Sequence, residues 1–193
     1  MNHPTSTSSS PDHSPISYWF NLLALLGICG SLVMAFAYQI FLNEIPCPLC
    51  QLQRVALIMA GIGLMLNIRF GPAAVHYAMI IFSALGGMTA SGRQILLHIA
   101  PGDAGYGSPL WGLHFYTWGF IAFGMMLIFS AIMLCIDRNH MQLNQQRISP
   151  NALTTLVILF FLILVATNMV SSVMVCQFGP CPDDPTTYLW KLF

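Results

Sequence analysis

Residues 43–54 read Asn-Glu-Ile-Pro-Cys-Pro-Leu-Cys-Gln-Leu-Gln-Arg and join one long apolar segment to the next. Cys47 and Cys50 therefore lie where a membrane helix begins, at the edge of a bilayer. Pro48 fits the first turn of that helix, where its missing N–H leaves no hydrogen bond unmade. Arg54 follows Cys50 by four residues, so the two lie on one helix face about 6 Å apart. The stretch predicts a thiol pair at the water boundary with a permanent cation just inside.

The composition places the whole chain in a membrane. Of 193 residues, 56% are hydrophobic and 6% are charged, whereas a soluble domain carries about 25% charged residues. The six basic and six acidic residues form no long run of either sign, so nothing indicates nucleic-acid binding. Long apolar segments separated by short polar ones predict an all-α membrane protein with one domain.

Five segments are long enough to cross a bilayer as helices. They cover about 18–42, 49–68, 73–98, 114–136 and 152–175, so the predicted transmembrane domain is 18–175. Residues 1–17 contain no Lys or Arg and are predicted to form a disordered N-terminal tail. Residues 176–193 are predicted to form an exterior C-terminal tail that carries a cysteine pair.

The positive charges predict the orientation of the five spans. Arg69, Arg138 and Arg147 fall in the two loops on the side of the N-terminus, and Lys191 lies in the tail on the other side. Because positive loops stay inside, the N-terminus is predicted to be cytoplasmic and the C-terminus exterior. Four cysteines then face the oxidising exterior: Cys47, Cys50, Cys176 and Cys181.

The cysteines differ in what their surroundings predict. Cys29 and Cys135 lie within apolar spans and are predicted to pack as small hydrophobes. Cys176 and Cys181 flank a turn with Gly and Pro that can bring two thiols within bonding range. That pair is either a structural staple for the tail or a second redox pair that relays to Cys47, and we prefer the relay because the first pair needs a route to soluble substrates.

The motif resembles a known family. Residues 46–50, Pro-Cys-Pro-Leu-Cys, with Gln53 and Arg54 in the helix that follows, resemble the DsbB family of quinone-dependent disulfide-generating membrane proteins. Residues 113–118 (Leu-His-Phe-Tyr-Thr-Trp) and 176–182 are also similar to members of that family, and the likeness covers roughly 18–136.

The resemblance implies a four-transmembrane-helix bundle core in the bacterial inner membrane, to which this chain adds a fifth helix. It also implies a membrane quinone, ubiquinone or menaquinone, as electron acceptor and a periplasmic DsbA-like thiol oxidase as protein partner. One feature departs from the family pattern, because the usual second cysteine pair lies in the loop after the third helix, and here residues 101–112 contain no cysteine. Cys176 and Cys181 are predicted to replace it.

These expectations assign roles to individual residues. A reduced substrate thiol would attack the Cys176–Cys181 disulfide, which Cys47 then reoxidises by exchange, releasing Cys50 as a thiolate that reduces the quinone. Arg54 would stabilise that thiolate and the reduced quinone. Near the exterior end of the third span, Arg93 and His98 are candidates for contact with the quinone or for anchoring at the interface.

Three other functions remain open at the level of sequence. The four exterior cysteines can act as thiolate ligands of a metal ion, although the catalytic reading assigns no metal site. They can also form two static disulfides in a structural helical bundle. A quinone-linked reductase of the vitamin-K-epoxide-reductase type would share the chemistry on a different scaffold.

Overall fold

The computed structural model describes residues 15–139, 151–177, 179, 181 and 188. Its elements are α1 (Pro15–Phe41), α2 (Pro48–Phe70), α3 (Ala74–Leu97), α4 (Phe115–Ile136), the short 3-10 helix η1 (Asp137–Asn139) and α5 (Ala152–Cys176). All five α-helices are long and apolar enough to cross a membrane. The predicted all-α membrane protein with five spans is therefore confirmed.

The division of the chain into a tail, a membrane domain and an exterior segment stays a prediction. Residues 1–14 lie outside the described residues, as do 140–150 and most of the chain after α5. α1 begins at Pro15 rather than near residue 18, so the last part of the predicted N-terminal tail is helical.

The ends of two helices follow from local sequence. At α2, Cys47 is the N-cap with an extended backbone, and Pro48 occupies the first turn. α2 ends at Gly71, whose φ of 87° lies in the region that favours glycine. At α5, the Asn151 side chain caps the helix by accepting a hydrogen bond from the Thr154 N–H at 2.9 Å.

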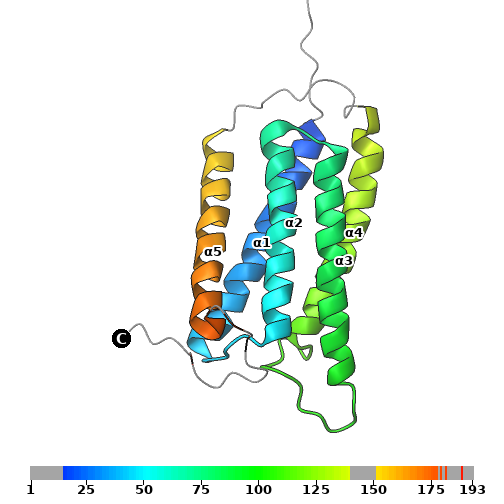
Figure 1. The fold of residues 1–193 in the computed structure, drawn as a ribbon. Coiled ribbons are helices and arrows are strands. Elements are labelled where there is room, and N and C mark those ends of the chain that lie inside the picture. Colours follow the sequence, from blue (N-terminus) through cyan, green and yellow to red (C-terminus); the bar gives the residue numbers. More distant parts are fainter. Residues whose placement is uncertain (1–14, 140–150, 178, 180, 182–187, 189–193) are drawn as a thin grey trace, which may run out of the picture.

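The helices form a bundle in which each of α1 to α4 packs on its neighbour in sequence, whereas α5 lies at the edge opposite α4 (Figure 1). α2 packs between α1 and α3, α4 packs on α3, and α5 packs against α1 and α2. The α1–α2 connection, the α3–α4 loop and the end of α5 all lie at one end of the bundle, the lower end in Figure 1. We call this the cysteine end, because Cys47, Cys50 and Cys176 lie there.

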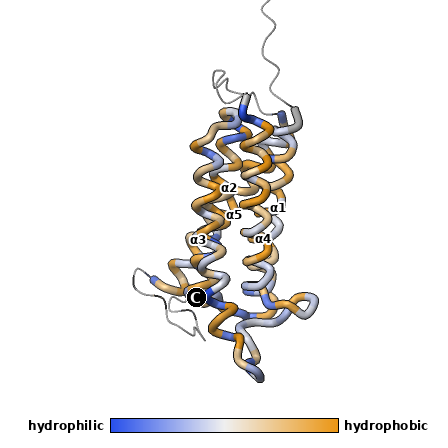
Figure 2. Tube along the Cα trace, turned by 90° about the vertical axis from the view of Figure 1, so that its right-hand side faces the viewer, coloured by the Kyte–Doolittle hydropathy of each residue, from blue (hydrophilic) through white to orange (hydrophobic). Residues whose placement is uncertain are grey.

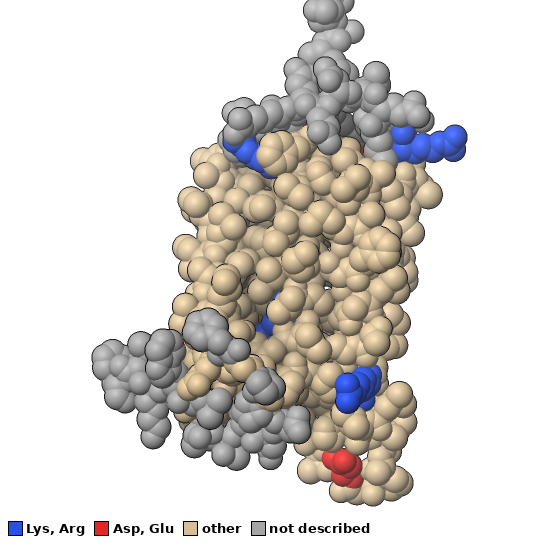
Figure 3. All heavy atoms as spheres, in the orientation of Figure 1, with Lys and Arg blue, Asp and Glu red and all other residues tan. Residues whose placement is uncertain are grey.

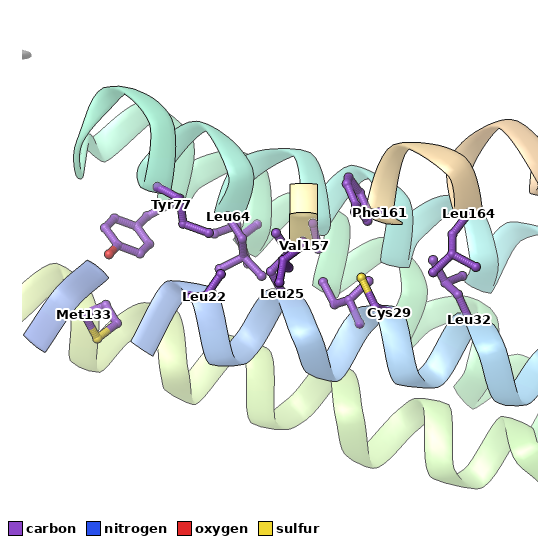
Figure 4. Close-up of a cluster of buried hydrophobic side chains, with 14 residues drawn as sticks. Leu22, Leu25, Cys29, Leu32, Leu64, Tyr77, Met133, Val157, Phe161 and Leu164 are labelled. Carbon is purple, nitrogen blue, oxygen red and sulfur yellow. The ribbon is translucent and has the colours of Figure 1, made fainter. Parts of the chain in front are cut away.

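The main core lies among α1, α2 and α5 and includes further buried side chains of α3 and α4 (Figure 4). Cys29 is 1% exposed on the side of α1 that faces Phe161 and Leu164 of α5, which confirms its predicted packing role. A Cβ atom on Gly61 of α2 would lie 2.6 Å from the Phe161 ring, so glycine at this position permits α5 to approach closely. Cys135 differs from its prediction, since it is a free thiol exposed on α4.

The outer surface of the bundle is apolar. Large hydrophobic side chains such as Phe82, Met125 and Ile163 are more than half exposed, and hydrophobic positions run along every helix in Figure 2. Charged side chains gather toward the two ends of the face drawn in Figure 3, with an almost uncharged belt between them. An apolar surface of this extent fits contact with lipid rather than water.

The end opposite the cysteines is held by buried polar side chains. Asp137 of η1 is fully buried and accepts hydrogen bonds from Ser17 of α1 and Tyr77 of α3, each at 2.7 Å. Asn21 of α1 donates to Tyr77 at 3.1 Å and accepts from Asn67 of α2 at 3.2 Å. These bonds connect the first three helices to the end of α4.

Candidate functional site

The first cysteine pair forms a disulfide at the start of α2. The Cα atoms of Cys47 and Cys50 are 5.0 Å apart, and the Cys50 backbone N–H donates to Cys47 Sγ at 3.2 Å. Cys47 is buried, at 6% exposed, while Cys50 is half-buried. The two sulfur atoms therefore differ in access, and Cys50 is the more open of the two.

Two glutamines lie against this disulfide. Gln94 of α3 places its side-chain nitrogen 3.4 Å from Cys47 Sγ and 3.6 Å from Cys50 Sγ. Gln53 of α2 donates to Gln94 Oε1 at 2.8 Å. Both glutamines are buried, so the disulfide has a polar neighbour in an otherwise apolar interior.

Arg54 is a buried cation with uncharged partners. Its guanidinium donates to Gln39 Oε1 at 2.7 Å and to the Ala35 carbonyl oxygen at 3.1 Å, and it lies 5.3 Å from the centre of the Phe36 ring. Among the described residues no carboxylate lies within ion-pair distance of Arg54. Within the described part of the chain, its positive charge therefore has no counter-ion.

Gln39 connects Arg54 to α5 and the C-terminal segment. While its oxygen accepts from Arg54, its nitrogen donates to Ser171 Oγ at 2.9 Å and to Tyr188 Oη at 3.0 Å. One buried side chain of α1 thus holds the cation of α2 in a fixed relation to α5.

A cavity of about 420 Å³ lies beside these groups. Cys50, Arg54 and Gln94 line it from α2 and α3, and further walls come from α1, α4 and the α3–α4 loop. The walls are rich in aromatic side chains, namely Tyr38, Tyr106, Trp111, Phe115, Tyr116, Trp118 and Phe123. Three further lining residues of α1, Gly30, Ser31 and Met34, are exposed on the outside of the bundle. The cavity therefore opens on the side of the bundle, where lipid would lie.

The α3–α4 loop is pinned over the cysteine end. Tyr106 donates through its hydroxyl to the Ile45 carbonyl oxygen at 2.5 Å. The backbone N–H of Ser108 donates to Glu44 Oε1 at 2.8 Å. These contacts fix the loop to the connection that leads into Cys47.

The second cysteine pair also forms a disulfide. Cys176 ends α5, and its Cα atom lies 4.3 Å from that of Cys181. Ile45 packs in one apolar cluster with Cys176, Cys181 and Tyr188. Because Ile45 precedes Cys47 by two residues, the second disulfide lies against the segment that carries the first.

Arg93 and His98, predicted as candidates for contact with a quinone, do not line the cavity. Arg93 is exposed on α3, and His98 pairs with Asp103 of the loop at 3.1 Å. The Gly105 N–H and the His98 ring hold the pKa of the Asp103 carboxyl below its ordinary value. The His98 ring also stacks on Tyr116, which does line the cavity.

Sequence reasoning missed Gln39 and Gln94 and gave Gln53 only as part of the motif. A signal was present, because uncharged polar side chains inside apolar spans are costly unless they have a partner or a function. Among the described residues, no group of three or more His, Cys, Asp or Glu side chains is arranged to hold a metal ion.

Comparison with known proteins identifies part of the chain. Residues 17–106 match the family "Disulfide bond formation protein DsbB". Disulfide bond formation protein B of Pseudomonas syringae pv. tomato is 47% identical over 88 residues, which are 42% of this chain and 52% of that protein. The Marinobacter nauticus protein of the same name is 34% identical over 91 residues, covering 45% of this chain and 54% of the relative. No solved structure matches the chain significantly.

The chain spans about half the length of the curated relatives it matches. The family match ends before α4, so α5 and the Cys176–Cys181 disulfide lie outside it, as does the likeness predicted for 107–136. Within the match lie most of α1, all of α2 and α3, and the Cys47–Cys50 disulfide. Over residues 17–106 the chain is therefore similar to the DsbB family, and the predicted resemblance is confirmed for this part of the chain.

Proposed function

We propose that this protein generates disulfides by passing electrons from a thiol substrate through its cysteines to a membrane quinone. In this proposal it is a thiol:quinone oxidoreductase of the bacterial inner membrane, with the cysteine end on the periplasmic side. The similarity to the DsbB family and the name of the relatives, disulfide bond formation protein, support the general activity.

One observation carries the proposal: Cys50 lines the same cavity as Arg54, a cation with no carboxylate partner among the described residues. Thiol–disulfide exchange leaves negative charge on a sulfur atom. A fixed guanidinium in a place shielded from water stabilises such charge far more than it would in solution. Arg54 is held in position by Gln39 and Ala35, so little reorganisation is needed when the charge forms.

The cavity also fits a quinone head group. Its volume of about 420 Å³ lies within the usual range for small-molecule sites, and its aromatic walls suit a flat ring. The side opening at Gly30 and Met34 would admit a molecule dissolved in the bilayer. A quinone bound there would supply an acceptor for two electrons and two protons.

The cysteines would carry the electrons in two exchanges. A substrate thiolate attacks the Cys176–Cys181 bond, and its second thiol closes a substrate disulfide, leaving both cysteines reduced. One of these thiols then attacks Cys47, the Cys47–Cys50 bond breaks, and Cys50 leaves with the electron pair as a thiolate. The other thiol of the second pair displaces Cys47, which re-forms the Cys176–Cys181 bond and leaves Cys47 as a thiol. The contact of Ile45 with the second disulfide supports this order. The substrate proposed is a periplasmic DsbA-like thiol oxidase.

The test is reduction of a soluble quinone by dithiothreitol, catalysed by the purified full-length protein. Cys50→Ala should abolish quinone reduction, because the thiolate that faces the cavity is lost. Arg54→Ala should lower kcat/KM for the quinone by about 100-fold, the effect of losing ~3 kcal/mol of electrostatic stabilisation.

The exposed Arg93 is the matched control for Arg54, and Arg93→Ala should retain activity. Full quinone reduction by Cys50→Ala would refute the proposal. An unchanged quinone dependence in Arg54→Ala would remove that residue from the site.

A further inference from the structure

We propose that the Gln94 carboxamide is a catalytic hydrogen-bond donor, which stabilises the thiolate released when the Cys47–Cys50 disulfide opens. The inference deepens the proposed function, since it assumes that this disulfide undergoes exchange. It concerns the sulfur chemistry alone and does not depend on the identity of the electron acceptor.

The orientation of the Gln94 amide is set by Gln53. Because Gln53 Nε2 donates to Gln94 Oε1 at 2.8 Å, that oxygen is held on the side of Gln53. The Gln94 nitrogen then points at the disulfide, 3.4 Å from Cys47 Sγ and 3.6 Å from Cys50 Sγ. The Gln94 oxygen lies farther from Cys50 Sγ, at 4.0 Å. Two donor hydrogens therefore face the two sulfur atoms.

A disulfide makes poor use of such a donor. Neutral sulfur is a weak acceptor, and Gln94 is only 2% exposed, so its N–H groups have given up water for a weak bond. A thiolate carries a full negative charge and binds the same donor much more strongly. The contact therefore strengthens as the S–S bond breaks, which is the condition for lowering a reaction barrier.

The two sulfur atoms differ in their other donors. Cys47 Sγ already accepts the backbone N–H of Cys50 at 3.2 Å, as an N-cap side chain does. For Cys50 Sγ, the Gln94 amide is the only donor that the described residues provide. Gln94 therefore supplies at Cys50 what the start of the helix supplies at Cys47.

The chemical step balances without an external oxidant. An incoming thiolate forms a new S–S bond with Cys47, the Cys47–Cys50 bond breaks, and the electron pair leaves on Cys50 Sγ. With dithiothreitol, the second thiol then displaces Cys47. The reagent ends as a cyclic disulfide and both cysteines end as thiols.

The test is the rate at which dithiothreitol opens the Cys47–Cys50 disulfide in the purified full-length protein, with no quinone present. Gln94→Met keeps the length and burial of the side chain but removes the donor, so opening should slow about tenfold, as expected for losing one hydrogen bond to a charged atom. Gln53→Met leaves the donor but frees its orientation, so opening should slow about threefold.

Gln51→Met is the matched control. Gln51 is also buried in the first turns of α2 and is adjacent to Cys50, but its oxygen accepts from Ser172 of α5 at 3.0 Å. The Cys47–Cys50 disulfide of this variant should open at the same rate as in the unmodified protein. The thermal midpoint of each variant shows whether it is folded.

The outcomes separate cleanly. If Gln94→Met is folded and its Cys47–Cys50 disulfide opens at the normal rate, the proposal is overturned. The proposal is also overturned if disulfide opening slows equally in Gln51→Met. If Gln94→Met does not fold, the other two variants decide. Slower disulfide opening in Gln53→Met but not in Gln51→Met supports the proposal, and equal opening rates in these two variants refute it. Because no quinone is present, failure here is distinct from failure of quinone reduction.

Discussion

The partners of Arg54 determine what that side chain can do. A carboxylate partner would cancel the charge of the guanidinium, whereas the oxygens of Gln39 and Ala35 satisfy its N–H groups and leave the charge in place. A buried charge without a counter-ion costs several kcal/mol. Such a cost is retained where the charge acts on a ligand or an intermediate, and here the charge lines a cavity next to a sulfur atom.

Access to that cavity can be tested at Gly30 of α1. A Cβ atom at Gly30 or at Gly27 would meet nothing within 4 Å, but only Gly30 lines the cavity. Gly30→Phe should place a ring in the opening and raise KM for a soluble quinone about tenfold, with unchanged opening of the disulfide by dithiothreitol. Gly27→Phe adds the same bulk elsewhere on α1 and should change neither value. Similar KM values for the two variants would contradict the assignment of the cavity.

The site is built mainly by α2 and α3, and α5 packs against it from outside the family match. α2 carries the first disulfide and Arg54, and α3 supplies Gln94. α5 lies outside the family match and contacts the partners of Arg54 through Ser171, which accepts a hydrogen bond from Gln39. The fifth helix thus carries a cysteine of the second disulfide and also contacts the residues around the first.

Comparing a protein thiol oxidase with dithiothreitol as the reductant tests whether the second disulfide is a relay or a structural staple. Cys176→Ala should block turnover with a protein thiol oxidase, because the relay is broken, and should spare quinone reduction driven by dithiothreitol. Cys135→Ala removes an exposed free thiol and should leave both activities intact. Initial rates with the two reductants provide the measurement. If Cys176→Ala retains both activities, the pair is a staple for the C-terminal segment.

The contact between α3 and α4 depends on one glycine. A Cβ atom on Gly87 would lie 2.2 Å from the Phe123 ring of α4, whereas a Cβ atom on the neighbouring Gly86 would meet nothing within 4 Å. Gly87→Ala should therefore force the two helices apart at a cost of about 1–3 kcal/mol. Its thermal midpoint should fall while that of Gly86→Ala does not. Equal midpoints would mean that the Phe123 ring moves aside freely.

The two ends of the bundle differ in their cysteines and in their positive charges. The cysteine end carries both disulfides, and the opposite end carries Arg69 and Arg138. Arg54 and Arg93 lie toward the cysteine end but within helices. Since positive residues in loops are retained in the cytoplasm, Arg69 and Arg138 support the proposal of a periplasmic cysteine end. Arg147 and Lys191, which also entered the predicted orientation, lie outside the described residues.

The orientation can be measured with single new thiols. Ala104 is exposed in the α3–α4 loop, and Ala74 is exposed at the start of α3, at the opposite end. In a protein whose free cysteines are replaced by alanine, Ala104→Cys should react in intact cells with a maleimide that cannot cross the membrane. Ala74→Cys should react only after the membrane is opened. The reverse pattern would place the cysteine end in the cytoplasm.

Hydropathy was sufficient to predict the five helices, because each crossing needs about 20 apolar residues. The inner face of each helix was harder to predict, since it depends on packing that has no local signal. Arg93 and Gln94 illustrate this limit. They are adjacent in sequence, but one residue turns an α-helix by about 100°, so Arg93 is exposed and Gln94 meets the sulfur atoms. Gln39 was missed for the same reason, as its partners come from α2, α5 and the C-terminal segment.

The lateral mouth of the cavity at Gly30, Ser31 and Met34 has a kinetic consequence. For a hydrophobic acceptor that enters from the acyl chains, the concentration that governs binding is its ratio to lipid, because almost none of it is dissolved in the buffer. Adding empty phospholipid to proteoliposomes that fuse and mix would dilute this acceptor in two dimensions and slow turnover, although its amount per millilitre stays the same. Saturation would then follow the mole percentage of acceptor in the bilayer, and lipids able to occupy the mouth would act as competitors.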